Sequence, residues 1–204
     1  MPRIIAGRYG GRRLTAPTGR DTRPTTDRVR ESLFSRLEHL DVLDDAVVLD
    51  LYAGSGALGL EAVSRGASRA VLVEIANGAA RTLRRNVAEL DAPAQIVVSD
   101  ADRYLRGATG EGDPEAGPID PWVDVAFLDP PYDLTDERLA RTLELLAPLL
   151  TRDAIVVVER SARSPEPTWP AGLVRFATRA QGETVLWYAE PPLDPQEEPP
   201  DRES

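Results

Sequence analysis

An apolar run at residues 46–51 is followed directly by glycines at positions 54, 56 and 59 and then by a stretch with helical periodicity. A short apolar run bounded by turn residues is typical of a strand buried on both faces of a parallel sheet. Glycines allow the chain to turn sharply from this strand into a helix, which the sequence predicts over residues 58–65. A chain with this unit is expected to fold as an α/β protein.

The same alternation of apolar runs and amphipathic stretches continues along the chain. It predicts strands at 46–51, 70–74, 95–99, 123–129 and 154–159, helices at 78–90 and 139–150, and a terminal strand pair at 173–178 and 184–188. Residues 107–121 are rich in Gly and Pro and are predicted to form a loop. We therefore expect an open, Rossmann-like α/β fold with a mostly parallel seven-stranded sheet and an antiparallel C-terminal strand pair.

The two ends of the chain differ in composition from this central region. Residues 1–40 are predicted to form a small N-terminal arm followed by a helix, which Thr26 or Asp27 caps. Residues 41–189 are predicted to form the α/β domain. Residues 190–204 are rich in Pro and acids and are predicted to be a disordered tail.

Charge is distributed unevenly along the chain. The formal net charge is −10, yet residues 1–36 hold nine arginines and only three acidic residues. The other 168 residues hold 15 basic and 31 acidic residues, so a basic arm is attached to an acidic body. This asymmetry is typical of an element that grips the phosphates of a nucleic acid. The candidate RNA-binding residues are Arg3, Arg8, Arg12, Arg13, Arg23 and Arg28.

Several classes of function are disfavoured by what the sequence lacks. The chain has no Cys and a single His, so we expect no disulfide, no thiol nucleophile and no metal site. Its apolar runs are far shorter than the roughly 18 residues of a membrane helix. The N-terminus lacks the apolar stretch of a signal peptide. We expect a monomeric, cytoplasmic protein with no membrane partner.

The glycine turn also predicts a cofactor site. Its spacing, GxGxxG, fits a loop whose backbone approaches a ligand closely at the N-terminus of a helix. That pattern alone fits either a dinucleotide or S-adenosylmethionine. Two features favour S-adenosylmethionine: an acid four residues before the first glycine, placed to face the cationic end of the cofactor, and two extra residues in the turn. The predicted cofactor-binding residues of the turn are Asp50, Tyr52, Ala53, Gly54, Ser55 and Gly56.

Two further acids stand at the ends of the next two predicted strands. Glu74 ends the strand at 70–74, where a carboxylate accepts hydrogen bonds from both hydroxyls of a ribose. Asp100 and its neighbour Ala101 follow the strand at 95–99, from which the carboxylate would reach an adenine amino group. These residues extend the predicted cofactor site.

The sequence Asp129-Pro130-Pro131-Tyr132 ends the predicted strand at 123–129, at the edge where open α/β sheets place their ligands. Because prolines cannot continue a strand's hydrogen-bond ladder, they are expected to fix an extended turn. This turn points the Asp129 carboxylate and the Pro130 carbonyl, both acceptors, into the crevice, and Tyr132 offers a stacking face. Such a set is suited to hold the exocyclic amine of a planar base, so these four residues are the predicted catalytic residues.

Together these motifs resemble those of the RsmD family of 16S ribosomal RNA guanine-N2 methyltransferases. The resemblance spans about residues 3–188. It includes the run from Arg23 to Phe34, the turn from Leu49 to Ala62, and the late Gly182-Glu183-Thr184.

The resemblance implies the fold of a class I S-adenosylmethionine-dependent methyltransferase, with S-adenosylhomocysteine as product and no metal. It implies that Gly54, Ser55, Gly56 and Glu74 hold the cofactor and that residues 129–132 hold the target base. Ile75, where the family pattern has a polar residue, is also a predicted cofactor-binding residue. The implied substrate is guanine 966 of 16S rRNA, within a 30S subunit or an assembly intermediate.

Three alternatives are open from the residues themselves. An adenine-N6 methyltransferase of DNA or RNA would use the same Asp-Pro-Pro-Tyr sequence. A dinucleotide-dependent oxidoreductase fits the glycine spacing but leaves residues 129–132 and the basic arm unexplained. A non-catalytic RNA-binding assembly factor would keep the fold without the reaction.

Overall fold

The computed structural model describes residues 2–17, 26–111 and 119–193. Of the sequence predictions, Arg23, residues 112–118 of the loop predicted at 107–121, and residues 194–204 of the predicted tail lie outside the described residues. Within the described part of the chain, no helix combines the length and the apolar character needed to cross a membrane.

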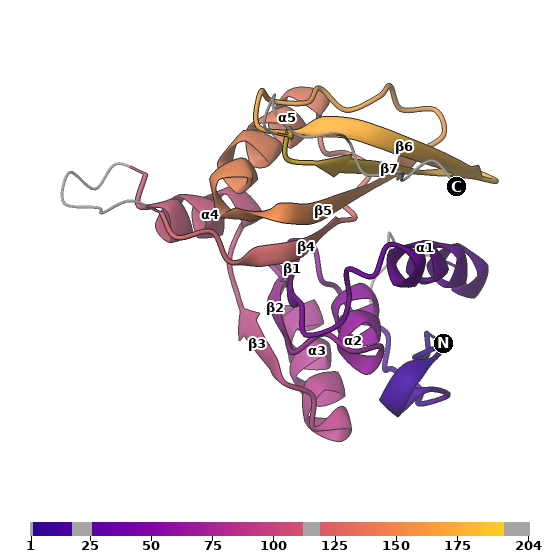
Figure 1. The fold of residues 1–204 in the computed structure, drawn as a ribbon. Coiled ribbons are helices and arrows are strands. Elements are labelled where there is room, and N and C mark those ends of the chain that lie inside the picture. The colour runs from indigo at the N-terminus through magenta and orange to yellow at the C-terminus, as the bar shows by residue number, and fades with distance from the viewer. Residues whose placement is uncertain (1, 18–25, 112–118, 194–204) are drawn as a thin grey trace.

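A seven-stranded sheet forms the centre of the fold (Figure 1). Its strands are β1 Val47–Asp50, β2 Arg69–Val73, β3 Ala94–Val97, β4 Val123–Leu128, β5 Leu150–Ser161, β6 Val174–Gln181 and β7 Thr184–Glu190. Their order is β3-β2-β1-β4-β5-β7-β6, in which β1 to β5 pair in parallel and β7 pairs antiparallel with β5 and β6. The predicted sheet is therefore confirmed, and the strand order reverses between β1 and β4.

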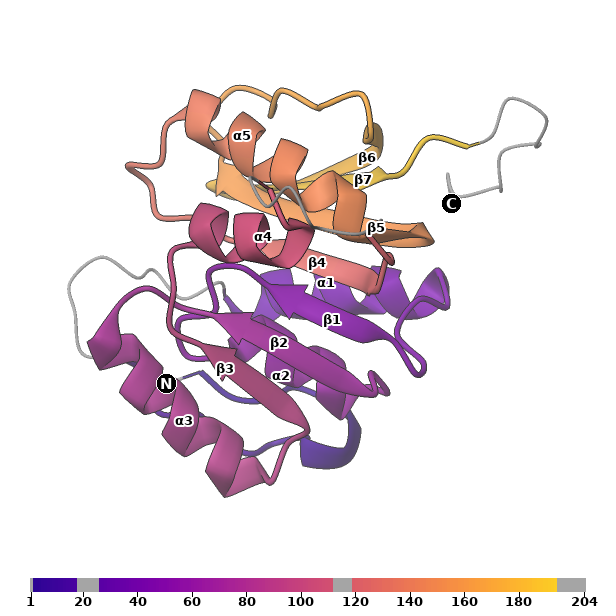
Figure 2. The same cartoon turned by 90° about the vertical axis from the view of Figure 1, so that its left-hand side faces the viewer.

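Helices cover both faces of the sheet (Figures 1 and 2). One apolar cluster joins the sheet to helices α1 Asp27–His39, α2 Ala57–Ser64 and α3 Asn77–Leu90. A second cluster joins the other face to α4 Ala101–Thr109, α5 Asp136–Leu146 and the short 3₁₀ helix η2 Ala147–Leu149. Because both faces of the sheet are covered, strands β1, β2 and β4 are almost continuously apolar.

Helix α4 corrects the predicted loop, since residues 107–109 are helical. The start of the helix is capped by Asp100, whose side chain accepts the N–H of Arg103 at 3.2 Å. Its end is marked by Gly110, at φ +66°, a left-handed conformation that favours glycine. Leu105, four residues after Ala101, is fully buried and provides the apolar contact of this short helix.

The N-terminal arm packs into the first cluster. It folds back on itself around the 3₁₀ helix η1 Gly7–Tyr9, with the Ile4 N–H bonded to the Arg12 carbonyl at 2.9 Å. Ile4 and Leu14 are 0% and 1% exposed and lie among residues of α1, α2 and α3. The arm is thus anchored by core side chains. As predicted, Thr26 caps α1 by accepting the N–H of Val29.

Candidate functional site

Four predicted acids follow four neighbouring parallel strands. Asp50 ends β1, Glu74 directly follows β2, Asp100 lies three residues after β3, and Asp129 directly follows β4. The carboxyl ends of parallel strands meet at one edge of the sheet, so the fold brings these residues to a common edge. The strand order reverses there between β1 and β4, which is where open α/β sheets bind ligands.

The glycines of the turn have two different roles. A Cβ on Gly56 would lie 2.6 Å from Leu83 Cδ1, and one on Gly59 would lie 2.3 Å from Leu72 Cδ2. Both positions therefore need glycine so that α2 can pack against α3 and the sheet. Gly54 has φ +54°, and a Cβ there would meet no atom closer than 4.0 Å. The backbone at Gly54 is thus the point where a ligand could approach the turn closely.

Asp50 lies beneath the glycine turn and is 1% exposed. Its two carboxylate oxygens accept the N–H groups of Gly59 at 3.2 Å and of Tyr52 at 3.4 Å. Burial raises the pKa of Asp50 to about 7, although these two hydrogen bonds act in the opposite direction. The carboxyl group therefore organises the glycine turn through these two hydrogen bonds.

Glu74 shapes the turn between β2 and α3. Its carboxylate accepts the N–H of Gly54 at 2.9 Å and the N–H of Ala76 at 2.6 Å, so it links this turn to the glycine turn. The next residue, Ile75, is 64% exposed, and Val98 after β3 is 39% exposed. Exposed apolar side chains beside a carboxylate are suited to flank a flat ring and to bind the hydroxyls attached to it.

The remaining residues of the turn are held by the protein. The Ala53 N–H donates to the Val73 carbonyl at 2.9 Å, and the Ser55 carbonyl accepts from Asn86 Nδ2 at 2.9 Å. The ring of Tyr52 packs against the second cluster, where burial raises the pKa of its phenol although Thr142 acts in the opposite direction. The backbone of Tyr52 is therefore better placed than its ring to contact a ligand.

Asp100 is occupied by two contacts. Besides capping α4, it forms an ion pair with Arg138 of α5, whose Nε also lies 3.5 Å from Asp102. Ala101, the first residue of α4, is buried. Sequence reasoning missed Arg138, because the two residues are 38 positions apart and no spacing pattern joins them.

The Asp-Pro-Pro-Tyr sequence forms a turn directly after β4. Pro130 is buried, and the Pro131 carbonyl accepts the N–H of Leu134 at 3.0 Å, which closes the turn. Asp129 is partly exposed, and Tyr132 is 66% exposed. The structure therefore holds an acidic side chain and an accessible aromatic ring on a turn whose backbone is fixed.

The candidate RNA-binding arginines differ in whether their side chains already contact other residues of the protein. Arg3 pairs with Asp27 at 3.0 Å, and Arg12 donates to the Glu89 carbonyl at 2.8 Å. Arg8 stacks on the ring of Tyr9, with 4.7 Å between the guanidinium carbon and the ring centroid. The side chains of Arg13 and Arg28 are exposed and have no acidic partner among the described residues.

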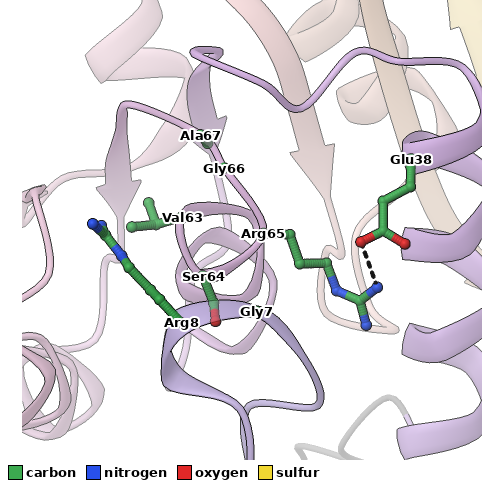
Figure 3. A pocket seen from close by; sticks show the side chains of 8 residues that line it. All are labelled: Gly7, Arg8, Glu38, Val63, Ser64, Arg65, Gly66 and Ala67. Atoms are coloured by element: carbon green, nitrogen blue, oxygen red, sulfur yellow. Dashed lines mark ion pairs between the residues drawn. The ribbon is translucent and has the colours of Figure 1, made fainter.

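A pocket of about 360 Å³ lies at the opposite end of α2 from the glycine turn (Figure 3). It is lined by Gly7 and Arg8 of the arm, by Ser64 and Arg65, and by Glu38 of α1. Arg65 pairs with Glu38 at 3.0 Å and with two further carboxylates, so its charge is compensated. The pocket is separate from the predicted site. No group of three His, Asp or Glu side chains suited to a metal ion occurs in the described part of the chain.

Several known proteins are similar to this chain in sequence and in fold. Residues 2–190 match the family described as "Conserved hypothetical protein 95". The Ribosomal RNA small subunit methyltransferase D of Escherichia coli K12 is 40% identical over 186 residues, which cover 90% of this chain and 86% of that protein. Its namesake from Haemophilus influenzae is 32% identical over 166 residues, which cover 80% of each chain. The solved structure of yhhF from Escherichia coli has a TM-score of 0.77 at 35% identity and covers 93% of this chain and 97% of its own.

Proposed function

The chain belongs to the family described as conserved hypothetical protein 95, the RsmD family, and from this premise we propose that it methylates the exocyclic N2 of guanine 966 in 16S rRNA. The observation that carries the proposal is the placement of Asp129 and Tyr132 directly after β4, beside the glycine turn after β1. An oxidoreductase has no use for this pair, whereas an amine on a flat base requires an acceptor and a stacking surface.

When bound, S-adenosylmethionine would supply the methyl group from its sulfonium, and S-adenosylhomocysteine would be the product. The residues at the strand ends fit this molecule. The open backbone at Gly54, with Ser55 and Gly56, would hold its amino-acid part, above the buried carboxyl group of Asp50. Glu74 would accept the ribose hydroxyls in place of the N–H groups that its carboxylate accepts in this structure. The remaining contacts of the proposed cofactor site come from Ile75, Asp100, Ala101, and the backbone of Tyr52 and Ala53.

The protein's part in the reaction is to orient the base. The amine donates its two hydrogens to the Asp129 carboxylate and the Pro130 carbonyl, which localises the nitrogen lone pair and aims it at the methyl carbon. When bound, the cofactor would supply a methyl carbon to which the nitrogen bonds as the C–S bond breaks, and the nitrogen would then pass one proton to the Asp129 carboxylate or to water. Asp129 need not be a strong base, because the newly methylated nitrogen is very acidic. No covalent enzyme intermediate is needed, in keeping with a chain that has no Cys.

The RNA partner is proposed to be the small-subunit RNA in a 30S particle or assembly intermediate, met by a monomer in the cytoplasm. Arg8, Arg13 and Arg28 are exposed and suited to phosphates. Arg3 and Arg12 would have to leave Asp27 and the Glu89 carbonyl, or contact RNA while still bound to them. Arg23 is likewise proposed to bind the phosphates of the RNA.

The proposal is tested with 30S particles from a strain that lacks this methyl group. We expect the purified protein to transfer tritium from labelled S-adenosylmethionine into the 16S rRNA. Digestion of the product to nucleosides should give N2-methylguanosine by mass spectrometry. N6-methyladenosine would favour the adenine alternative. Binding to the particles without any incorporation would favour the assembly factor.

Replacing Tyr132 separates stacking from packing. Tyr132 is 66% exposed, so its ring is free to stack on an extruded guanine, a contact worth about 1–3 kcal/mol per base. Tyr132→Ala should therefore lower kcat/KM by roughly 5- to 150-fold. Tyr132→Phe, which keeps the ring, should cost about two-fold or less. Equal losses in the two variants would show that the hydroxyl, and not the ring face, is what the reaction uses.

A further inference from the structure

Asn86 joins two distant parts of the chain through one buried side chain. It lies on α3 and is 1% exposed. Its Nδ2 donates to the Thr15 carbonyl at 2.9 Å and to the Ser55 carbonyl at 2.9 Å, while its Oδ1 accepts the Thr15 N–H at 2.9 Å. Both amide hydrogens and one oxygen lone pair of Asn86 are therefore in use.

The two partners of Asn86 belong to the two binding elements of the proposed function. Ser55 stands in the glycine turn, between Gly54, the open point of the backbone, and Gly56, which precedes α2. Thr15 stands in the N-terminal arm, next to the fully buried Leu14. Helix α3 supplies the shared amide, so a change in the glycine turn reaches the arm through a single side chain.

We propose that Asn86 is a positioning residue that couples the cofactor turn to the N-terminal arm, so that filling the cofactor site orders the arm for RNA. The proposal rests on the function proposed above. The proposal follows from the shared amide. A ligand that fixes the Ser55 peptide also restricts the side chain of Asn86. Less conformational entropy is then lost when Asn86 forms its two hydrogen bonds with Thr15. Coupling of this kind is reciprocal, so RNA held by the arm would strengthen cofactor binding by the same factor.

The arm also contacts α2, through Glu61, and this contact allows the role of Asn86 to be isolated. The Glu61 carboxylate accepts the N–H groups of Ile5 and Ala6 at 2.7 and 3.0 Å, but it lies in the middle of α2, and within the described chain its side-chain hydrogen bonds and ion pairs involve no residue of the glycine turn. Glu61 therefore holds the arm in place whether or not the cofactor turn is ordered. Asn86 alone, among the described side chains, is hydrogen-bonded to both.

The test is hydrogen exchange of the full chain with and without saturating S-adenosylhomocysteine, with saturation verified by calorimetry. In the wild type we expect S-adenosylhomocysteine to slow amide exchange in the glycine turn. We also expect it to slow exchange in the arm segment around Thr15, by about five-fold or more. In Asn86→Ala the turn should still respond and the arm should not. The matched control is Thr15→Ala, which removes only a side chain, keeps both backbone bonds to Asn86, and should behave as the wild type.

The outcomes are separable from the proposed function. If the wild type does not bind S-adenosylhomocysteine, the proposed function fails. If it binds but the arm does not respond, or if the arm of Asn86→Ala still responds, the coupling is overturned. Asn86→Asp keeps the volume of the side chain but removes both of its hydrogen-bond donors. This variant replaces Asn86→Ala in the experiment if the alanine variant does not fold. Should neither variant fold, the response of the wild-type arm decides.

Discussion

Replacing Asp129 with alanine should abolish methyl transfer and leave cofactor binding unchanged. Asp129 follows Leu128, the last buried residue of β4, and precedes the buried Pro130, so buried residues hold the turn on both sides of it. The variant loses an acceptor for the target amine and nothing from the apolar core. Removing one preoriented group that acts in the transition state costs about 10²- to 10³-fold in kcat, so turnover should fall at least that far.

Two variants calibrate this result. Asp129→Asn keeps one acceptor oxygen and should lose less activity than the alanine variant. Asp133→Ala removes an exposed carboxylate four residues along the same turn and should be as active as the wild type. Tritium transfer into 30S particles measures the rate, and calorimetry measures the affinity for S-adenosylmethionine. Wild-type turnover in Asp129→Ala would remove the carboxylate from the reaction. A parallel loss of cofactor affinity would assign it to the cofactor site instead.

The sheet and the placement of the acids were predictable because both depend on local patterns. Runs such as 70–74 and 123–129 are apolar for the length of a strand, and the residue types that end them mark where each strand stops. The carboxyl ends of parallel strands then share an edge by topology, which is enough to bring Glu74 and Asp129 to one site. The short helix α4 was missed although Asp100 and Gly110 mark its ends, because Gly107 and the following Gly- and Pro-rich stretch indicate a loop.

What the sequence could not predict are contacts between residues far apart in the chain. Asn86 is 71 positions from Thr15, and Glu61 is 55 or 56 positions from the arm residues whose N–H groups it accepts. In sequence, a polar residue on a helix indicates a solvated face. Here both side chains are buried because they satisfy the backbone of an arm that covers them. Such pairing follows from the tertiary fold and leaves no periodic pattern.

Among substitutions of polar side chains, Glu61→Ala should lower the free energy of unfolding most. Glu61 is 0% exposed, and its carboxylate accepts Arg65 Nε at 2.8 Å besides the two backbone N–H groups of the arm. Arg30 Nη1 lies 3.9 Å away, and the side chains of Arg30 and Arg65 are only 1% and 3% exposed. Glu61→Ala would leave two buried guanidinium groups short of charge compensation and two amides without an acceptor. Breaking a buried pair in this way costs about 3–5 kcal/mol.

Glu38 provides the matched control, because its carboxylate pairs with the same Arg65 at 3.0 Å but is 48% exposed. Exposed ion pairs contribute about 0–1 kcal/mol, so Glu38→Ala should lower the free energy of unfolding only slightly. Urea denaturation of both variants measures the difference. If Glu61→Ala were no more destabilising than Glu38→Ala, the buried Ile4 and Leu14 and the other hydrogen bonds of the arm, such as those of Asn86, would be enough to hold it. The expected gap of several kcal/mol would instead show that burial, and not the number of charges around Arg65, decides what an ion pair contributes here.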